Sequence, residues 1–169
     1  MSYRNKTYVA FASEDITQYR LMEAWRDNQH IDFNFYDAHD LNISRDSSRD
    51  ETIRANLRQR MNSAKQFVLL GSAHARRKGG DSNTFLGYEV QTMVKLDLPI
   101  VVANLGGDRG IVKGFIPQPL LDAGYYTLSV SFQPKIIKYG LDGYASQYPG
   151  SGKSGPHLYP VSVYSQLGL

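Results

Sequence analysis

The chain has 169 residues, of which 41% are hydrophobic, 21% charged and 12% aromatic, a composition typical of one soluble globular domain. It contains no cysteine, which excludes a disulfide framework and fits a reducing compartment. The longest apolar runs, residues 67–70 and 99–103, are far too short to cross a bilayer, and the first six residues resemble neither a signal peptide nor a membrane anchor. We therefore expect a soluble, cytoplasmic protein without a membrane partner.

Positive charge gathers in the middle of the chain. Lysine and arginine total 19 against 16 acidic residues, but residues 41–80 alone hold nine basic and three acidic side chains. We interpret Arg54, Arg58 and Arg60 as part of the solvated face of a helix. The basic residues of this segment as a group could instead face an anionic ligand such as a dinucleotide or a nucleic-acid backbone; they are Arg45, Arg49, Arg54, Arg58, Arg60, Lys65, Arg76, Arg77 and Lys78. Because no nucleic-acid-binding motif accompanies the charge, we expect no nucleic-acid partner.

Strands and helices alternate along the first half of the chain. Residues 7–11 are aromatic and β-branched and predict a strand, and residues 16–28 carry apolar side chains at helical spacing. Apolar and polar residues alternate over 31–37, which predicts a second strand. The polar residues 38–49 predict a long loop, and residues 50–64 return to helical spacing.

The second half continues the alternation. Residues 66–72 form a continuous apolar run, typical of a strand buried on both faces of a parallel sheet. The next predicted elements are a basic loop, a helix, two strands and a short helix, over residues 74–83, 84–96, 100–104, 125–130 and 134–139. This order predicts an α/β fold with a doubly wound, parallel five-stranded sheet in a three-layer sandwich.

The last thirty residues differ in composition from the rest. We expect one domain over residues 1–140 and, over residues 141–169, a Gly/Tyr/Pro-rich C-terminal extension that packs on the domain or on a partner. Residues 148–159 have too few aliphatic side chains to predict a core strand.

A short motif in this extension resembles a phosphate-binding P-loop. Gly150-Ser151-Gly152-Lys153-Ser154 has the end of the signature, but Gln147 stands where its first glycine belongs. Gly155-Pro156 would break the helix that must follow. We therefore interpret this segment as a turn.

Ligands of parallel sheets bind at the carboxyl ends of the strands, so the loops after the first three predicted strands are candidate site regions. Glu89 is set apart by its context. It lies one turn beyond Phe85 on the same face of a helix whose N-terminus points at these loops, so an aromatic ring and a carboxylate can line one cavity. The four histidines are scattered and no Gly-x-Ser-x-Gly elbow occurs, so neither a metal site nor a serine hydrolase is predicted.

Several segments, taken in order, resemble a TIR-like domain. They are Tyr8-Val9-Ala10-Phe11 with Ala12-Ser13-Glu14-Asp15 after it, the strand ending at Tyr36-Asp37 and its long polar loop, Phe67-Val68-Leu69-Leu70-Gly71-Ser72, and Phe85-Leu86-Gly87-Tyr88-Glu89 before Pro99-Ile100-Val101. The similarity is to the bacterial TIR-like group that includes the TIR proteins of Thoeris antiphage defence, and it covers roughly residues 5–140. In this family an aromatic residue, often tryptophan, precedes the catalytic glutamate by four residues, as Phe85 precedes Glu89.

The resemblance implies a flavodoxin-like TIR fold and an enzyme that cleaves NAD between nicotinamide and ribose. Such an NAD glycohydrolase or ADP-ribosyl cyclase would make an ADP-ribose-derived, cyclic signal for a downstream effector in antiphage defence. Glu89 would be the catalytic residue, stabilising an oxocarbenium-like ribosyl centre. NAD is then the substrate, and no cofactor or metal is expected. The expected substrate-binding residues are Phe11, Ala12, Ser13, Asp37, Ser44, Arg49 and Phe85.

Two other functions remain open from the sequence. A TIR-like scaffold could mediate assembly without chemistry, and a nucleoside deoxyribosyltransferase-like enzyme could use the same carboxylate on another N-glycosidic bond. Many TIR enzymes build their site between two subunits, so we also expect a homo-oligomer.

Overall fold

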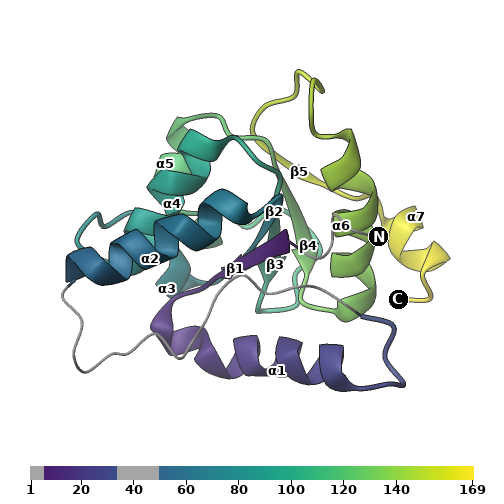
Figure 1. The fold of residues 1–169 in the computed structure, drawn as a ribbon. Helices are drawn as coiled ribbons and strands as arrows, with labels where there is room; N and C mark the ends of the chain where they lie inside the picture. The colour runs from purple at the N-terminus through teal and green to yellow at the C-terminus, as the bar shows by residue number, and fades with distance from the viewer. Residues whose placement is uncertain (1–5, 34–49) are drawn as a thin grey trace.

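The computed structural model describes residues 6–33 and 50–169, which form a parallel sheet between two layers of helices (Figure 1). In chain order the elements are β1 (Thr7–Ala10), η2 (Ser13–Asp15), α1 (Ile16–Asp27), α2 (Asp50–Ser63), β2 (Gln66–Gly71), α3 (Ala73–Gly79), α4 (Phe85–Leu96), β3 (Ile100–Asn104), η3 (Lys113–Phe115), α5 (Gln118–Asp122), β4 (Thr127–Ser131), α6 (Pro134–Gln147), β5 (Pro156–Leu158) and α7 (Val161–Gln166). The five strands lie in the order β1-β2-β3-β4-β5, and every neighbouring pair is parallel. This confirms the predicted fold class.

Two hydrophobic cores flank the sheet. Successive residues of a strand point to opposite faces, so Tyr8 and Phe67 enter a core with α2, α3, α4 and α5, while Val9 and Val68 enter a core with α1, α6 and α7. Every residue of β2 and β3 is buried, as the uninterrupted apolar runs predicted. No helix within the described ranges has the length and apolar character needed to cross a membrane.

The strand predicted over residues 31–37 is not found in its described part. Ile31 and Phe33 donate their amides to the nearby carbonyls of Asn28 and Ile31, at 3.1 and 2.8 Å, which makes a turn. The ring of Phe33 is buried edge-on against Trp25, with the ring centroids 5.6 Å apart. The alternation of residues 31–33 therefore reflects packing against α1, and residues 34–37 lie outside the described ranges, as does the loop predicted over 38–49.

The segment predicted as a basic loop, residues 74–83, contains a helix. α3 begins at Ala73 because the side chain of Ser72 caps it, accepting a hydrogen bond of 3.0 Å from the amide of Ala75. Its apolar surface is confined to two small buried residues, Ala75 and Gly79, so the seven-residue sequence carries no helical hydrophobic pattern.

The C-terminal residues join the sheet and its second core. α6 continues to Gln147 rather than ending near residue 139, and Pro156–Leu158 forms the short edge strand β5 beside β4, where no strand was expected. In α7, Tyr164 is fully buried, and its hydroxyl accepts a hydrogen bond of 3.1 Å from the amide of Ser131. The guanidinium of Arg109 lies 4.5 Å from the centre of the same ring. The division of the chain at residue 140 stays a prediction.

Candidate active site

Helix α4 is fixed at its N-terminus by one threonine and one glycine. The hydroxyl of Thr84 accepts a hydrogen bond of 2.9 Å from the amide of Gly87, which caps the helix, and it donates one of 2.6 Å to the carbonyl of Lys78. A Cβ atom on Gly87 would lie 1.9 Å from the carbonyl oxygen of Asp81, so only glycine lets the loop approach the helix this closely. This start places α4 at the carboxyl edge of the sheet.

Glu89 lies on the inner face of α4, towards the sheet. Its side chain is only 4% exposed, and its carboxyl group accepts a hydrogen bond from the buried hydroxyl group of Tyr8 in β1. The second oxygen, Oε2, is buried and has no hydrogen-bond partner within the described residues. Burial raises the pKa of the Glu89 carboxyl to about 8, and the hydrogen bond from Tyr8 opposes part of this rise.

This environment is costly for the fold. An acceptor that is buried without a partner costs about 1–3 kcal/mol, and carboxyl groups with strongly raised pKa values gather at functional sites. A residue retained only for packing would avoid the cost, since an apolar side chain of similar shape would fill the same space. Glu89 is therefore the strongest candidate for a catalytic group in the described chain.

Phe85 begins α4 one turn before Glu89. Its side chain remains 37% exposed, although it is a large apolar ring. The spacing of four residues places the ring and the carboxyl on neighbouring turns of one helix, as expected from the sequence. The structure thus offers an accessible aromatic surface beside a carboxyl that is closed off from solvent.

A group of charged side chains lies at the same edge, where β1 ends and α3 begins. The carboxylate of Glu14 is 3.1 Å from Nδ1 of His74 and 3.0 Å from a guanidinium nitrogen of Arg77, and it also pairs with the ammonium of Lys78. That ammonium donates a further hydrogen bond of 2.8 Å to the hydroxyl of Ser13. We call Ser13, Glu14, His74, Arg77 and Lys78 the Glu14 cluster.

A buried hydrogen bond also links the segment that follows β1 to the segment that follows β2. Ser72 donates a hydrogen bond of 2.5 Å to the buried carboxylate of Asp15, while the same hydroxyl caps α3. The two loops are therefore held in one arrangement by groups shielded from water, which strengthens such hydrogen bonds.

The other predicted site residues have different places. Phe11 stacks on Tyr19 of α1, with centroids 4.6 Å apart and 16° between the ring planes, so one of its faces is used for packing. Ala12 is 1% exposed and belongs to the first core. Three further predicted binding residues lie outside the described ranges: Asp37, Ser44 and Arg49. All these assignments stay predictions.

Sequence reasoning did not assign roles to the partners of Glu14. His74, Arg77 and Lys78 were visible as part of the basic middle segment, and the signal that could have placed them was Ser72 as a helix cap directly after a buried strand. Once α3 is recognised, residues at positions 74, 77 and 78 fall on neighbouring turns at the carboxyl edge.

Arg76 has a structural role instead. Its guanidinium donates to the carbonyls of Lys113 and Ile116, at 2.7 and 2.9 Å, and to the side chain of Gln118. Arg76→Ala should lower the free energy of unfolding by about 2 kcal/mol, since it leaves charge-assisted hydrogen bonds unmade. Urea denaturation followed by circular dichroism measures this, with the exposed Arg58→Ala as control. Equal stabilities of the two variants would contradict the role.

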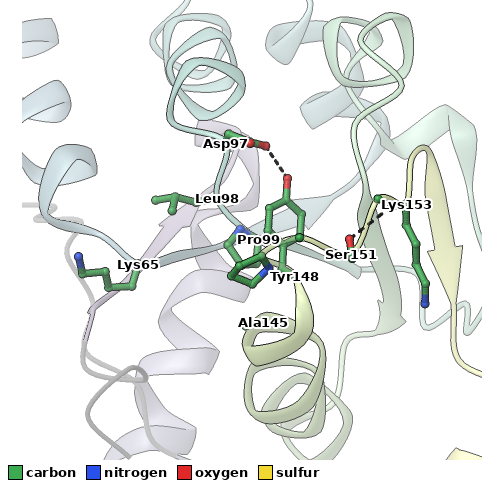
Figure 2. A pocket seen from close by; sticks show the side chains of 11 residues that line it. Lys65, Asp97, Leu98, Pro99, Ala145, Tyr148, Ser151 and Lys153 are labelled. Atoms are coloured by element: carbon green, nitrogen blue, oxygen red, sulfur yellow. Dashed lines mark hydrogen bonds between the residues drawn. The ribbon is translucent and has the colours of Figure 1, made fainter.

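A cavity of about 600 Å³ lies at the opposite edge of the sheet and contains none of the predicted site residues. Figure 2 shows Tyr148 between Asp97 and Pro99, with Lys65 on one side and Ser151 and Lys153 on the other. The hydroxyl of Tyr148 donates a hydrogen bond of 2.8 Å to Asp97. The C-termini of α4 and α6 lie there, and the side chains of Lys65 and Lys153 also line the cavity. Glu89, the strongest candidate group, does not line this cavity.

Comparison with protein families identifies the domain. Residues 8–109 match the family of the TIR-like domain of the Thoeris protein ThsB. The chain belongs to this family. The matched residues of the TIR-like domain include Tyr8–Ala10 of β1, the Glu14 cluster, Phe85 and Glu89, and the family links the chain to Thoeris antiphage defence. Comparison with curated proteins gives no match.

Proposed function

We propose that this TIR-like domain cleaves the nicotinamide–ribose bond of NAD and that Glu89 is its catalytic carboxyl. The observation that supports the proposal most is the buried Oε2 of Glu89, an acceptor with no partner among the described residues, one helical turn beyond the exposed ring of Phe85. Membership of the family also supports the proposal, because Glu89 lies within the matched TIR-like domain.

Cleavage of the nicotinamide–ribose bond requires little proton transfer by the protein. Nicotinamide carries a positive charge in NAD and leaves as a neutral molecule with the electron pair of the broken C–N bond, so no general acid is needed. Positive charge then develops on the ribose, and an ionised carboxylate beside it lowers the energy of the transition state. Oε2 of Glu89, which has no partner among the described residues, would accept a hydrogen bond from a ribose hydroxyl once the substrate gains access to it, while Tyr8 holds the carboxyl group in place.

The protonation state of Glu89 fits a cationic substrate. With a pKa of about 8, the carboxyl is mostly neutral at pH 7 while it is buried and unoccupied. The positive nicotinamide ring favours the ionised form, since an opposite charge within a few ångströms lowers the pKa of an acid. Substrate binding thus favours loss of the Glu89 proton to solvent and produces the carboxylate that the reaction requires.

The fate of the ribosyl cation depends on what lies next to it. Water would give ADP-ribose, whereas a hydroxyl or an adenine nitrogen of the same molecule, held close to C1′, would give a cyclic product and release a proton. Phe85 supplies an apolar wall that limits the approach of water. We propose that the product is a cyclic, ADP-ribose-derived signal that acts on a separate effector in antiphage defence.

The test is release of nicotinamide from NAD by the purified protein. The wild type and the surface control Glu23→Gln should release it at similar rates, and Glu89→Gln should be slower by about 100-fold or more because the charge that stabilises the cation is lost. Mass spectrometry of the product distinguishes cyclic from linear ADP-ribose. No nicotinamide from concentrated wild type would favour a scaffold, and cleavage of deoxynucleosides instead of NAD would favour the transferase.

A further inference from the structure

The Glu14 cluster holds more positive than negative charge. Arg77 and Lys78 each carry one positive charge, and Glu14 supplies the single negative charge that they share. The hydrogen bond from Lys78 lowers the pKa of Glu14 to about 2, so this carboxylate stays ionised throughout the physiological range. The chain therefore keeps two cations next to each other, with one anion between them.

The cations are accessible to a ligand. The side chain of Arg77 is 66% exposed and that of His74 is 45% exposed, while Lys78 is partly covered. A surface ion pair of this kind contributes little to stability, because water competes for each charge. Three basic side chains nevertheless contact the single carboxylate of Glu14. We explain these contacts by a need to hold the cations in fixed positions.

The cluster is joined to the candidate active site. The carbonyl of Lys78 accepts the hydrogen bond of Thr84, the residue that caps α4 directly before Phe85. Ser13, which follows β1, contacts the ammonium of Lys78. The basic side chains are thus presented at the edge of the sheet where a ligand of Glu89 would lie.

We infer that the Glu14 cluster binds the diphosphate group of a nucleotide, with phosphate oxygens taking the place of the Glu14 carboxylate on Arg77 and Lys78. A guanidinium can bind two phosphate oxygens at once, an ammonium acts as a point charge, and a diphosphate offers several oxygens and more than one negative charge. The inference rests on the proposed function, in which the diphosphate is that of NAD, and it assigns the phosphate end of the substrate to two residues that were not among the predicted substrate-binding residues.

The arrangement gives the two members of one ion pair opposite effects on ligand binding. Lys78→Gln removes a phosphate partner and should weaken binding of a nucleoside diphosphate by about tenfold or more, as expected for a lost charge-assisted hydrogen bond. Glu14→Gln removes the internal anion that competes with the ligand and should strengthen binding several-fold. A purely structural ion pair would not give effects of opposite sign.

Calorimetric titration with ADP, inorganic pyrophosphate and adenosine tests whether the Glu14 cluster binds a diphosphate. ADP and pyrophosphate should bind to the wild type and adenosine much more weakly. Lys138→Gln and Glu23→Gln, which alter other surface ion pairs, should leave ADP binding unchanged. Thermal melting of each variant shows whether it is folded.

The results also separate this inference from the proposed function. ADP binding with the two opposite shifts, in a protein that does not release nicotinamide, would keep the diphosphate site and overturn NAD cleavage. Nicotinamide release with ADP binding that neither Lys78→Gln nor Glu14→Gln alters would keep the enzyme and overturn the diphosphate site. Absence of any ADP or pyrophosphate binding by the folded wild type would also overturn it.

Discussion

Glu89→Gln should raise the free energy of unfolding by about 3 kcal/mol at pH 7, although it removes the proposed catalytic group. The folded carboxyl has a pKa of about 8 and its ordinary value is 4.5, so at pH 7 it is protonated in the folded chain and ionised in the unfolded chain. Unfolding then releases a proton, and rising pH favours the unfolded state. Glutamine has nearly the shape of the protonated acid and cannot ionise, so it escapes this penalty.

The direction of the pKa shift determines how the difference in stability between wild type and Glu89→Gln changes with pH. A raised pKa favours the folded state fully below about pH 4.5, and the advantage is lost as the pH rises towards 8. Wild type and Glu89→Gln should therefore have similar stability near pH 4.5 and separate steadily up to pH 8. Urea denaturation at several pH values measures the difference, with Glu23→Gln as the control that stays parallel to wild type. A constant difference across the range would mean that Glu89 is not held neutral in the folded protein.

Gly87→Ala should destabilise the protein by about 3 kcal/mol, because the new methyl group would overlap the backbone of the preceding loop. A Cβ atom at this position would lie 1.9 Å from the carbonyl oxygen and 2.6 Å from the carbonyl carbon of Asp81. Neither can move without breaking the cap that Thr84 provides. In an open helix the same change would stabilise by up to about 1 kcal/mol, so the sign itself is informative.

Gly114→Ala is the matched control, since no atom lies within 4 Å of the Cβ it would add. Its free energy of unfolding should stay within about 0.5 kcal/mol of wild type. Chemical denaturation and the NAD assay are both needed, because a shift of the first turn of α4 moves Phe85 and Glu89. A Gly87→Ala protein as stable as wild type would show that the loop does not approach the helix as described.

Sequence patterns predicted the strands and helices that supply many of the buried side chains of the two cores. β2 and β3 are continuous apolar runs, and α1 and α4 carry apolar residues at helical spacing, so burial and pattern agree. α3 was missed because a seven-residue helix with two small buried residues has no such pattern. The strand β5 was missed because it is a three-residue edge strand that is only half-buried.

The sequence predicted the role of Glu89 but not the contacts that form the Glu14 cluster. The spacing of Phe85 and Glu89 and the resemblance to TIR-like domains predicted Glu89 as the catalytic residue, and the structure adds that its carboxyl is buried, with one oxygen that has no partner among the described residues. The Glu14 cluster depends on contacts between residues more than sixty positions apart, such as Glu14 with Lys78, and no local pattern encodes those. Phe11 was predicted as a substrate-binding residue, which stays a prediction, and its stacking on Tyr19 of α1 was not predictable from any local pattern.

The C-terminal strand β5 covers the edge of β4, although the composition of this segment did not predict a strand. The amide of Thr127 donates to Gly155, and Pro156 and Leu158 lie in register beside Thr127 and Ser129. A protein shortened before residue 155 would leave β4 as a bare edge, with main-chain groups ready to pair with another molecule. The matched region ends at residue 109, yet a strand from the final fifteen residues, β5, completes the sheet of this domain beside β4.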